Sequence, residues 1–184
     1  MIKNNHKYLI GLIVMVIMFI SAVIIRYENI EPSAMASDIE VEGVLELNNT
    51  GIRNDKEYVL NIKMTKNKNC HIITYPYIDG LGYMTFNEGD KENYYVPGSI
   101  GSDGVTEPIG ITALKNNNII ANETDISLYG FWFPDEAGQY KARMYFNKLD
   151  TFKEIKNPVL VCVYTEEKYG KQLTWSKIIP ISIQ

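Results

Sequence analysis

The sequence contains few of the residues that usually carry catalytic or metal chemistry. Its 184 residues include two histidines and two cysteines, and His71 is the only histidine beyond the N-terminal segment. No C-x-x-C or H-x-x-x-H spacing occurs, which argues against a zinc site. The G-x-S-x-G elbow of serine hydrolases is also missing. We therefore expect no catalytic residue, no metal ligand and no cofactor.

An excess of basic residues is missing too. The formal net charge is -4, so the chain offers no electrostatic footprint to nucleic acid. Hydrophobic residues make up 46% of the chain, which is enough to build a core. Thirteen tyrosines, together with many Ile, Val and Thr residues, favour strands. Frequent Asn, Ile and Lys residues are typical of an AT-rich bacterial genome.

An uncharged apolar run, Leu9–Ile25, lies close to the N-terminus. As a helix it would span roughly 25 Å, which is at the short end for a bilayer crossing. Residues 1–8 are basic and residues 26–38 carry acidic groups, so the positive-inside rule predicts a cytoplasmic N-terminus and an external C-terminal domain. The same pattern fits a secretory signal peptide cleaved after Ala36, at the sequence Ala34-Met35-Ala36, which would release a secreted protein. The sequence is therefore compatible with a membrane anchor and with a signal peptide.

Beyond a tether at residues 26–38, residues 39–184 show the alternation of strands with one buried face. Ile126–Phe133 and Val159–Tyr164 are apolar on both faces, as central strands are, and Pro180 predicts an edge position for the last strand. No helical pattern follows residue 38, so we expect an all-β antiparallel sandwich behind a single N-terminal helix. The other predicted strands are Ile39–Leu47, Tyr58–Met64, Cys70–Tyr75, Leu81–Phe86, Ile109–Leu114, Ile119–Ala121, Gln139–Phe146 and Ile178–Ile183.

The segment Phe133–Tyr140 joins two of these strands and carries a local motif. Its Asp135, a small residue and Tyr140 resemble the turn before strand F of bacterial immunoglobulin-like domains. In that family the tyrosine is the tyrosine corner, whose hydroxyl binds a backbone group a few residues upstream. The resemblance implies an immunoglobulin-like sandwich with Ile126–Phe133 as strand E. The chain departs from the family at Ala142, where the strand-F cysteine would stand, and in having two further strands after strand F.

The two cysteines, Cys70 and Cys162, each lie in a predicted strand. In an oxidising compartment they could form a disulfide; the alternative is a pair of buried, reduced thiols. Val159–Cys162 is also similar to the strand that precedes the nucleophile of sortase-like transpeptidases. That chemistry needs an arginine for the oxyanion, and none follows Cys162, so we do not expect it.

Aromatic residues at loops and strand ends are the best indication of a binding function. Exposed rings can stack on sugars or anchor a protein partner, and buried ones close the ends of a sandwich. The long polar stretch Asn87–Pro108 is a second candidate, because loops of that length are often functional. We expect a non-enzymatic binding or assembly domain at the cell surface, with a carbohydrate-binding module or an unidentified cell-envelope enzyme as alternatives. The candidate binding residues are Tyr75, Tyr77, Tyr94, Tyr95 and Trp175.

Overall fold

The computed structural model describes residues 3–121, 126–148 and 154–184, which fall into two compact units. The first unit contains the N-terminal helix α1 (Lys3–Glu28), the chain as far as Pro32, and residues Glu167–Leu173. The second unit contains Ser33–Glu166 and Thr174–Gln184, and it holds most of the β-structure.

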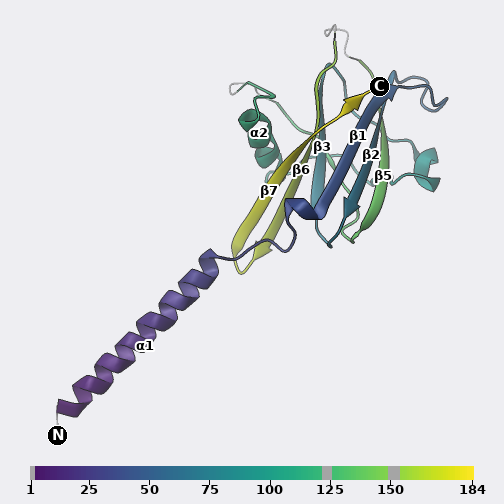
Figure 1. The fold of residues 1–184 in the computed structure, drawn as a ribbon. Helices are drawn as coiled ribbons and strands as arrows, with labels where there is room; N and C mark the ends of the chain where they lie inside the picture. The colour runs from purple at the N-terminus through teal and green to yellow at the C-terminus, as the bar shows by residue number, and fades with distance from the viewer. Residues whose placement is uncertain (1–2, 122–125, 149–153) are drawn as a thin grey trace. The chain divides into compact units, whose positions relative to one another are not determined.

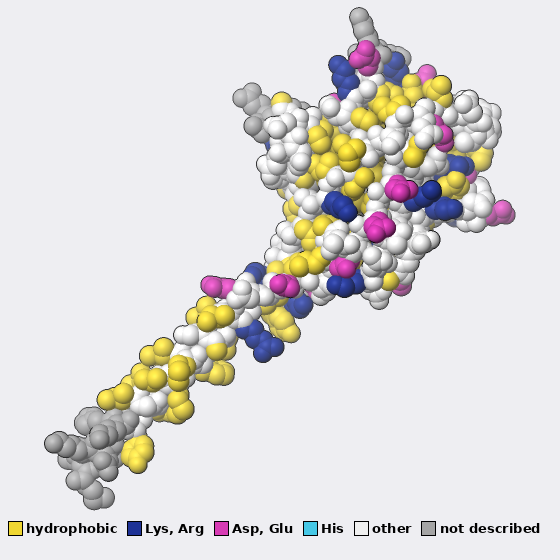
Figure 2. Space-filling model, in the orientation of Figure 1, with side chains coloured by type: hydrophobic (Ala, Val, Ile, Leu, Met, Phe, Trp, Pro, Cys, Tyr) yellow, Lys and Arg dark blue, Asp and Glu magenta, His cyan; other side chains and the backbone are white. Residues whose placement is uncertain are grey.

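Helix α1 has the length and composition of a membrane span or a signal sequence. Within its segment Tyr8–Glu28, an 18-residue window has a mean hydropathy of 3.0, and the side chains of the segment are exposed along the whole length. Figure 2 shows these apolar side chains (yellow) lining the helix on its visible face. The helix ends where both the backbone and the side-chain nitrogen of Asn29 bond the Ile25 carbonyl, at 3.1 and 2.7 Å, and Pro32 follows, as is common after a helix end.

The strands form two four-stranded sheets, as expected for a sandwich (Figure 1). Sheet A has the strand order β5-β2-β1-β8, and sheet B has the order β4-β3-β6-β7. Strand β8 runs parallel to β1, so the expected fully antiparallel arrangement is wrong for this one pair. The bounds are β1 Ile39–Leu47, β2 Tyr58–Lys66, β3 Ile72–Asp79, β4 Phe131–Trp132, β5 Gly138–Phe146, β6 Lys156–Lys168, β7 Lys171–Pro180 and β8 Ser182–Ile183.

Alternating apolar residues build the main core from both sheets. Leu45, Leu60 and Met144 come from sheet A, and Ile72 and Leu160 come from sheet B; all five side chains are fully buried. Their alternate neighbours on β1, β2 and β5 are mostly polar or charged, which gives sheet A a solvated outer face. Both chain-terminal strands, β7 and β8, are edge strands, as Pro180 indicated.

A second apolar cluster covers the outer face of sheet B. Helix α2 (Thr106–Asn116) lies against this face (Figure 1) and contributes Ala113 and Leu114, which cluster with Val161 and Val163 of β6. This covering explains why the β6 sequence is apolar on both faces. The prediction of a strand at Ile109–Leu114, and of no helix after residue 38, is therefore wrong.

Three other predicted strands are shortened or are not formed. Leu81–Phe86 forms only isolated bridges, from Leu81 to Lys148 and from Thr85 to Tyr145. Ile126–Phe133 is a strand only at Phe131–Trp132, because most of it crosses toward α2 as irregular chain. Ile119–Ala121 is not a strand.

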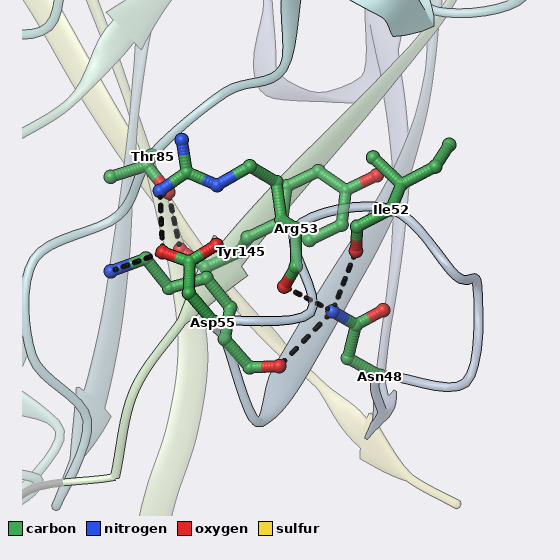
Figure 3. Close-up of polar contacts among 7 residues, drawn as sticks. Asn48, Ile52, Arg53, Asp55, Thr85 and Tyr145 are labelled. Atoms are coloured by element: carbon green, nitrogen blue, oxygen red, sulfur yellow. Dashed lines mark hydrogen bonds and ion pairs between the residues drawn. The ribbon is translucent and has the colours of Figure 1, made fainter.

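Asn48 organises the loop between β1 and β2 (Figure 3). Its side-chain amide nitrogen donates to the carbonyls of Ile52, Arg53 and Lys56, at 2.9, 2.9 and 3.0 Å. Arg53 occupies the left-handed region, with φ of 50°, and its guanidinium bonds Asp55 at 2.9 Å. One amide thus gathers three carbonyls that the turn leaves without strand partners.

Candidate functional site

An open groove of about 620 Å³ runs beside β5. A smaller hollow of about 220 Å³ on the outer face of sheet A shares Gln139, Tyr140 and Lys141 with it. We call the two together the β5 groove. The remaining lining residues are Lys91, Asn93, Tyr94, Tyr95 and Val96 in the larger part, and Glu40, Glu42, Lys63, Met64 and Thr65 in the smaller part.

The chain from Leu81 to Tyr95 lies along the free edge of β5 and forms one wall of the groove. Thr85 and Tyr145 exchange two backbone hydrogen bonds, at 3.0 and 2.9 Å, and the Thr85 hydroxyl donates to the Tyr145 carbonyl (Figure 3). Further along, the Tyr95 amide donates to the Lys141 carbonyl at 2.6 Å. This segment therefore covers part of an edge strand that would otherwise present unpaired backbone groups.

A buried contact fixes the middle of this wall. Asp90 lies in the short 3-10 helix η2 (Glu88–Glu92) and is almost fully buried. Its carboxylate accepts a hydrogen bond of 2.7 Å from the Tyr145 hydroxyl. Burial, and then this bond to Asp90, raises the pKa of Tyr145 to about 12.

The Tyr95 ring packs inward rather than standing free in the groove. Its centroid lies 5.7 Å from that of Phe133, which in turn lies 5.9 Å from that of Tyr140. The Tyr140 hydroxyl donates to the Glu136 carbonyl, four residues upstream, at 2.9 Å. This bond pins the connection that leaves β4 in sheet B and enters β5 in sheet A.

Tyr94 begins a polar chain that crosses the outer face of sheet A. The Arg143 guanidinium lies 4.1 Å from the Tyr94 ring centroid and also bonds the Tyr94 hydroxyl. The same guanidinium donates to Asn61 at 2.9 Å, and Asn61 donates to Glu46 at 2.7 Å. The contacts link β5, β2 and β1, so Tyr94 is held in one orientation.

Charged and amide groups dominate the rest of the groove. The strand register sets Lys63 of β2 opposite both Glu42 of β1 and Lys141 of β5. Gln139 adds an amide beside Lys141. A groove of this kind can hold a polar, extended ligand through hydrogen bonds and side-chain charges.

Of the five predicted binding residues, only Tyr94 and Tyr95 line the β5 groove. Tyr75 is fully buried beneath α2, where its hydroxyl bonds Thr106 at 2.7 Å and burial raises its pKa to about 12. Tyr77 is half-buried on the same face of sheet B, and its hydroxyl donates to Asp79 at 2.5 Å.

Trp175 is the fifth predicted binding residue; it is partly buried and packs against the main core. Its ring stacks on Tyr164, with centroids 5.3 Å apart, and its indole nitrogen donates to the Ala34 carbonyl at 2.8 Å. Burial, and then a hydrogen bond to Glu166, raises the pKa of Tyr164 to about 12. Trp175 is thus occupied by packing and by a backbone bond.

The groups considered for chemistry are also separated. Cys70 and Cys162 are free, buried thiols, and burial raises the pKa of Cys162 to about 11. His71 is exposed and its Nδ1 lies 2.9 Å from the Asp135 carboxylate. Across residues 3–121, 126–148 and 154–184, no three His, Cys, Asp or Glu side chains lie close enough to hold a metal ion.

The polar lining of the groove was not predicted from the sequence. Lys141 and Arg143 alternate with buried residues on β5, so their exposure could be read from the pattern. Their closeness to Tyr94 could not, because it depends on where the chain from residue 81 to 95 returns. No protein-family model matches the chain, and no curated protein matches its sequence.

Proposed function

We propose that the chain is a membrane-anchored, extracytoplasmic binding domain of the bacterial cell surface, without enzymatic activity. Helix α1 supplies the anchor, and the β5 groove supplies the binding surface. The proposal is supported most directly by the groove itself, where Tyr94, Tyr95 and Lys141 line an open, polar surface. The deep burial of Cys162, with its raised pKa, favours an unreactive thiol and therefore a non-catalytic role.

Retention of α1 is favoured over cleavage after Ala36, because the proposed cleavage motif is part of the folded β-domain. Ala34 is 0% exposed and belongs to the main core. Ser33 bonds the Glu166 carboxylate through its amide and hydroxyl, at 2.8 and 2.6 Å. Lys177 also donates to the carbonyls of Ala36 and Ile39. Cleavage after Ala36 would remove a core residue, together with the partly buried hydrogen bonds that Trp175 makes to Ala34 and Lys177 makes to Ala36.

An immunoglobulin-like relationship for the sandwich is supported by the connection between β4 and β5. The two strands lie in different sheets, as strands E and F of that family do, and the Tyr140 hydroxyl makes the upstream backbone bond. Ala142 at the cysteine position and the three strands after β5 set this chain apart from the family's usual form.

We favour a protein segment as the ligand of the groove. A polar peptide can pair its own charged groups with Glu42, Lys63 and Lys141, one acidic and two basic side chains that lie opposite one another on three neighbouring strands. A carbohydrate is the second candidate, because Tyr94 and Tyr95 line the groove. Sugar recognition usually needs an open ring face, whereas Arg143 covers Tyr94 and Phe133 packs against Tyr95.

The groove can be tested by placing a photo-crosslinking amino acid at Lys141 in cells that express the full chain. We expect an adduct whose mass and fragmentation identify a peptide, and we expect Tyr94→Ala to abolish it. A matched control carries the crosslinker at Asn54, an exposed position in the β1–β2 loop. Equal labelling at both positions would refute the groove as a binding site. A sugar adduct at Lys141 would replace the peptide proposal with the carbohydrate one.

A further inference from the structure

The tip of the hairpin between β6 and β7 is tied to the end of helix α1. These residues belong to the same compact unit. The Lys171 ammonium donates to the carbonyl of Glu28, the last residue of α1, at 2.9 Å, and to that of Tyr27 at 3.4 Å. The same ammonium lies 5.9 Å from the centroid of the Tyr27 ring. A cation from the hairpin thus satisfies the carbonyls that a helix end leaves unpaired.

This tie places the hairpin tip at a defined depth if α1 crosses a bilayer. The segment Tyr8–Glu28 has 21 residues, and as a helix it is about 30 Å long, which matches the hydrocarbon thickness. Glu28 then lies at the boundary between hydrocarbon and headgroups. Tyr169 is two residues from Lys171, which is about 7 Å along a strand. The headgroup layer is roughly 5–8 Å thick, so this distance is similar to the thickness of the layer.

Tyr169 is an unusual residue for the turn that it occupies. Tyr169 and Gly170 form a two-residue turn in which both φ angles are positive, at 54° and 73°. Such turns favour Asn or Gly at the first position, and a bulky residue there is strained. The Tyr169 side chain is nevertheless 79% exposed, so no packing within the protein offsets that strain.

We infer that the β6–β7 hairpin tip is a second membrane contact, with the Tyr169 ring lying in the headgroup layer of the bilayer that α1 spans. Tyrosine is enriched at this depth because its ring is apolar and its hydroxyl remains hydrated. Tyr27, at the end of α1, is also exposed and lies at the same boundary. The inference rests on the proposed anchor role of α1. It adds a second point of membrane contact within the unit that holds α1.

The contact does not depend on anionic lipid. Near the C-terminal end of α1 and in the hairpin tip, Arg26, Lys168 and Lys171 are balanced by Glu28, Glu31 and Glu167. The Lys168 ammonium donates to the Glu31 carbonyl at 3.4 Å. A hairpin tip without net charge is attracted only weakly to a negatively charged lipid surface. We therefore expect the Tyr169 ring to lie at the same depth in purely zwitterionic bilayers.

The test uses nitroxide labels on the full chain in phosphatidylcholine vesicles, one at each of Tyr169→Cys, Tyr83→Cys and Ile17→Cys. Tyr83 is the matched control, because it is an exposed tyrosine of the β-domain with a similar exposure of 74%. The unsubstituted protein is treated with the same nitroxide reagent, which shows how much label the buried Cys70 and Cys162 take up. Collision with a water-soluble nickel chelate and with oxygen reports the depth of each label.

We expect the Ile17 label to lie in the hydrocarbon, the Tyr83 label in water, and the Tyr169 label between them with several-fold lower nickel access than Tyr83. Added phosphatidylglycerol should not change this order. Equal nickel access at Tyr169 and Tyr83, with Ile17 still in the hydrocarbon, would overturn the hairpin contact and leave the anchor standing. A water-exposed Ile17 label would instead overturn the anchor itself.

Discussion

At the scale of single residues, Asn48 shows how a loop in this protein is held by one amide. The two hydrogens of its side-chain nitrogen are shared among three backbone carbonyls. Asn48→Asp replaces that donor with a carboxylate, so we expect the free energy of unfolding to fall by about 1–3 kcal/mol. Asn54→Asp, the same change at an exposed position of this loop, should have little effect. Urea denaturation of both variants measures the difference, and equal stabilities would contradict the role of Asn48.

A second residue, Tyr145, predicts how stability depends on alkaline pH. Its folded-state pKa is raised to about 12, chiefly by burial, whereas an unfolded tyrosine titrates near 10. The neutral hydroxyl therefore contributes stability that is complete below about pH 10 and is lost as the pH rises toward 12; the loss is up to about 2–3 kcal/mol. Tyr75 and Tyr164 act in the same direction.

Tyr145→Phe should flatten this dependence, because the variant has no hydroxyl to ionise. It should also lower stability at neutral pH, since the buried Asp90 carboxylate loses its donor. Tyr169→Phe, at an exposed ring, serves as the control. Denaturation between pH 8 and pH 11 measures both effects. If the free energy of unfolding of Tyr145→Phe falls with pH as steeply as that of the unsubstituted protein, the Tyr145 hydroxyl is not the group responsible.

The candidate site could be predicted only in part at this scale. Tyr94 and Tyr95 lie in a long polar loop, which predicts a binding role, and that loop does line the groove. The positions of Tyr75 and Trp175 near strand ends predict the same role, but the residues that cover these two rings come from distant parts of the chain. Tyr75 is covered by α2 through Thr106, and Trp175 is bonded to Ala34, 141 residues away. Burial of an aromatic ring depends on such long-range contacts, which local pattern does not contain.

At the scale of elements, helix α2 shows why the residue pattern of Ile109–Leu114 predicts a strand where the structure has a helix. Ile109 and Ile111 alternate as strand residues do, and β-branched side chains favour strands. The buried positions are in fact Thr106, Gly110, Ala113 and Leu114, which have helical spacing. Because three of these four are small or polar, a hydrophobicity pattern does not reveal them. The alternating strands of sheet A, with large apolar residues, were predicted almost residue for residue.

At Gly110, α2 packs closely against Leu128 and against Tyr75 of sheet B. A Cβ atom there would lie 2.9 Å from the Leu128 side chain and 3.5 Å from the Tyr75 ring. Gly110→Leu would push α2 away from β3, and we expect a loss of about 1–3 kcal/mol in the free energy of unfolding. Asn116→Leu, at an exposed position of the same helix, is the matched control. The proposed packing is contradicted if both variants unfold at the same urea concentration.

At the scale of the whole molecule, the boundary of the β-domain is set by packing rather than by sequence composition. Residues 26–38 were predicted as a tether, yet Ala34 is buried in the core and Ser33 bonds Glu166. A chain beginning at Ser37 should therefore be less stable than one beginning at Ser33, by about 2–4 kcal/mol. Ala34→Glu in the longer chain should reproduce most of that loss. Thermal denaturation of the three proteins tests this directly.

The central claim is that the protein keeps α1 and works as an anchored domain. The most direct test is the intact mass of the native protein, recovered separately from the membrane fraction and from the medium. The account predicts one species in the membrane fraction, whose mass and N-terminal peptides show that residues 1–36 are retained. A soluble species in the medium that begins at Ser37, with no full-length chain in the membrane, would contradict it.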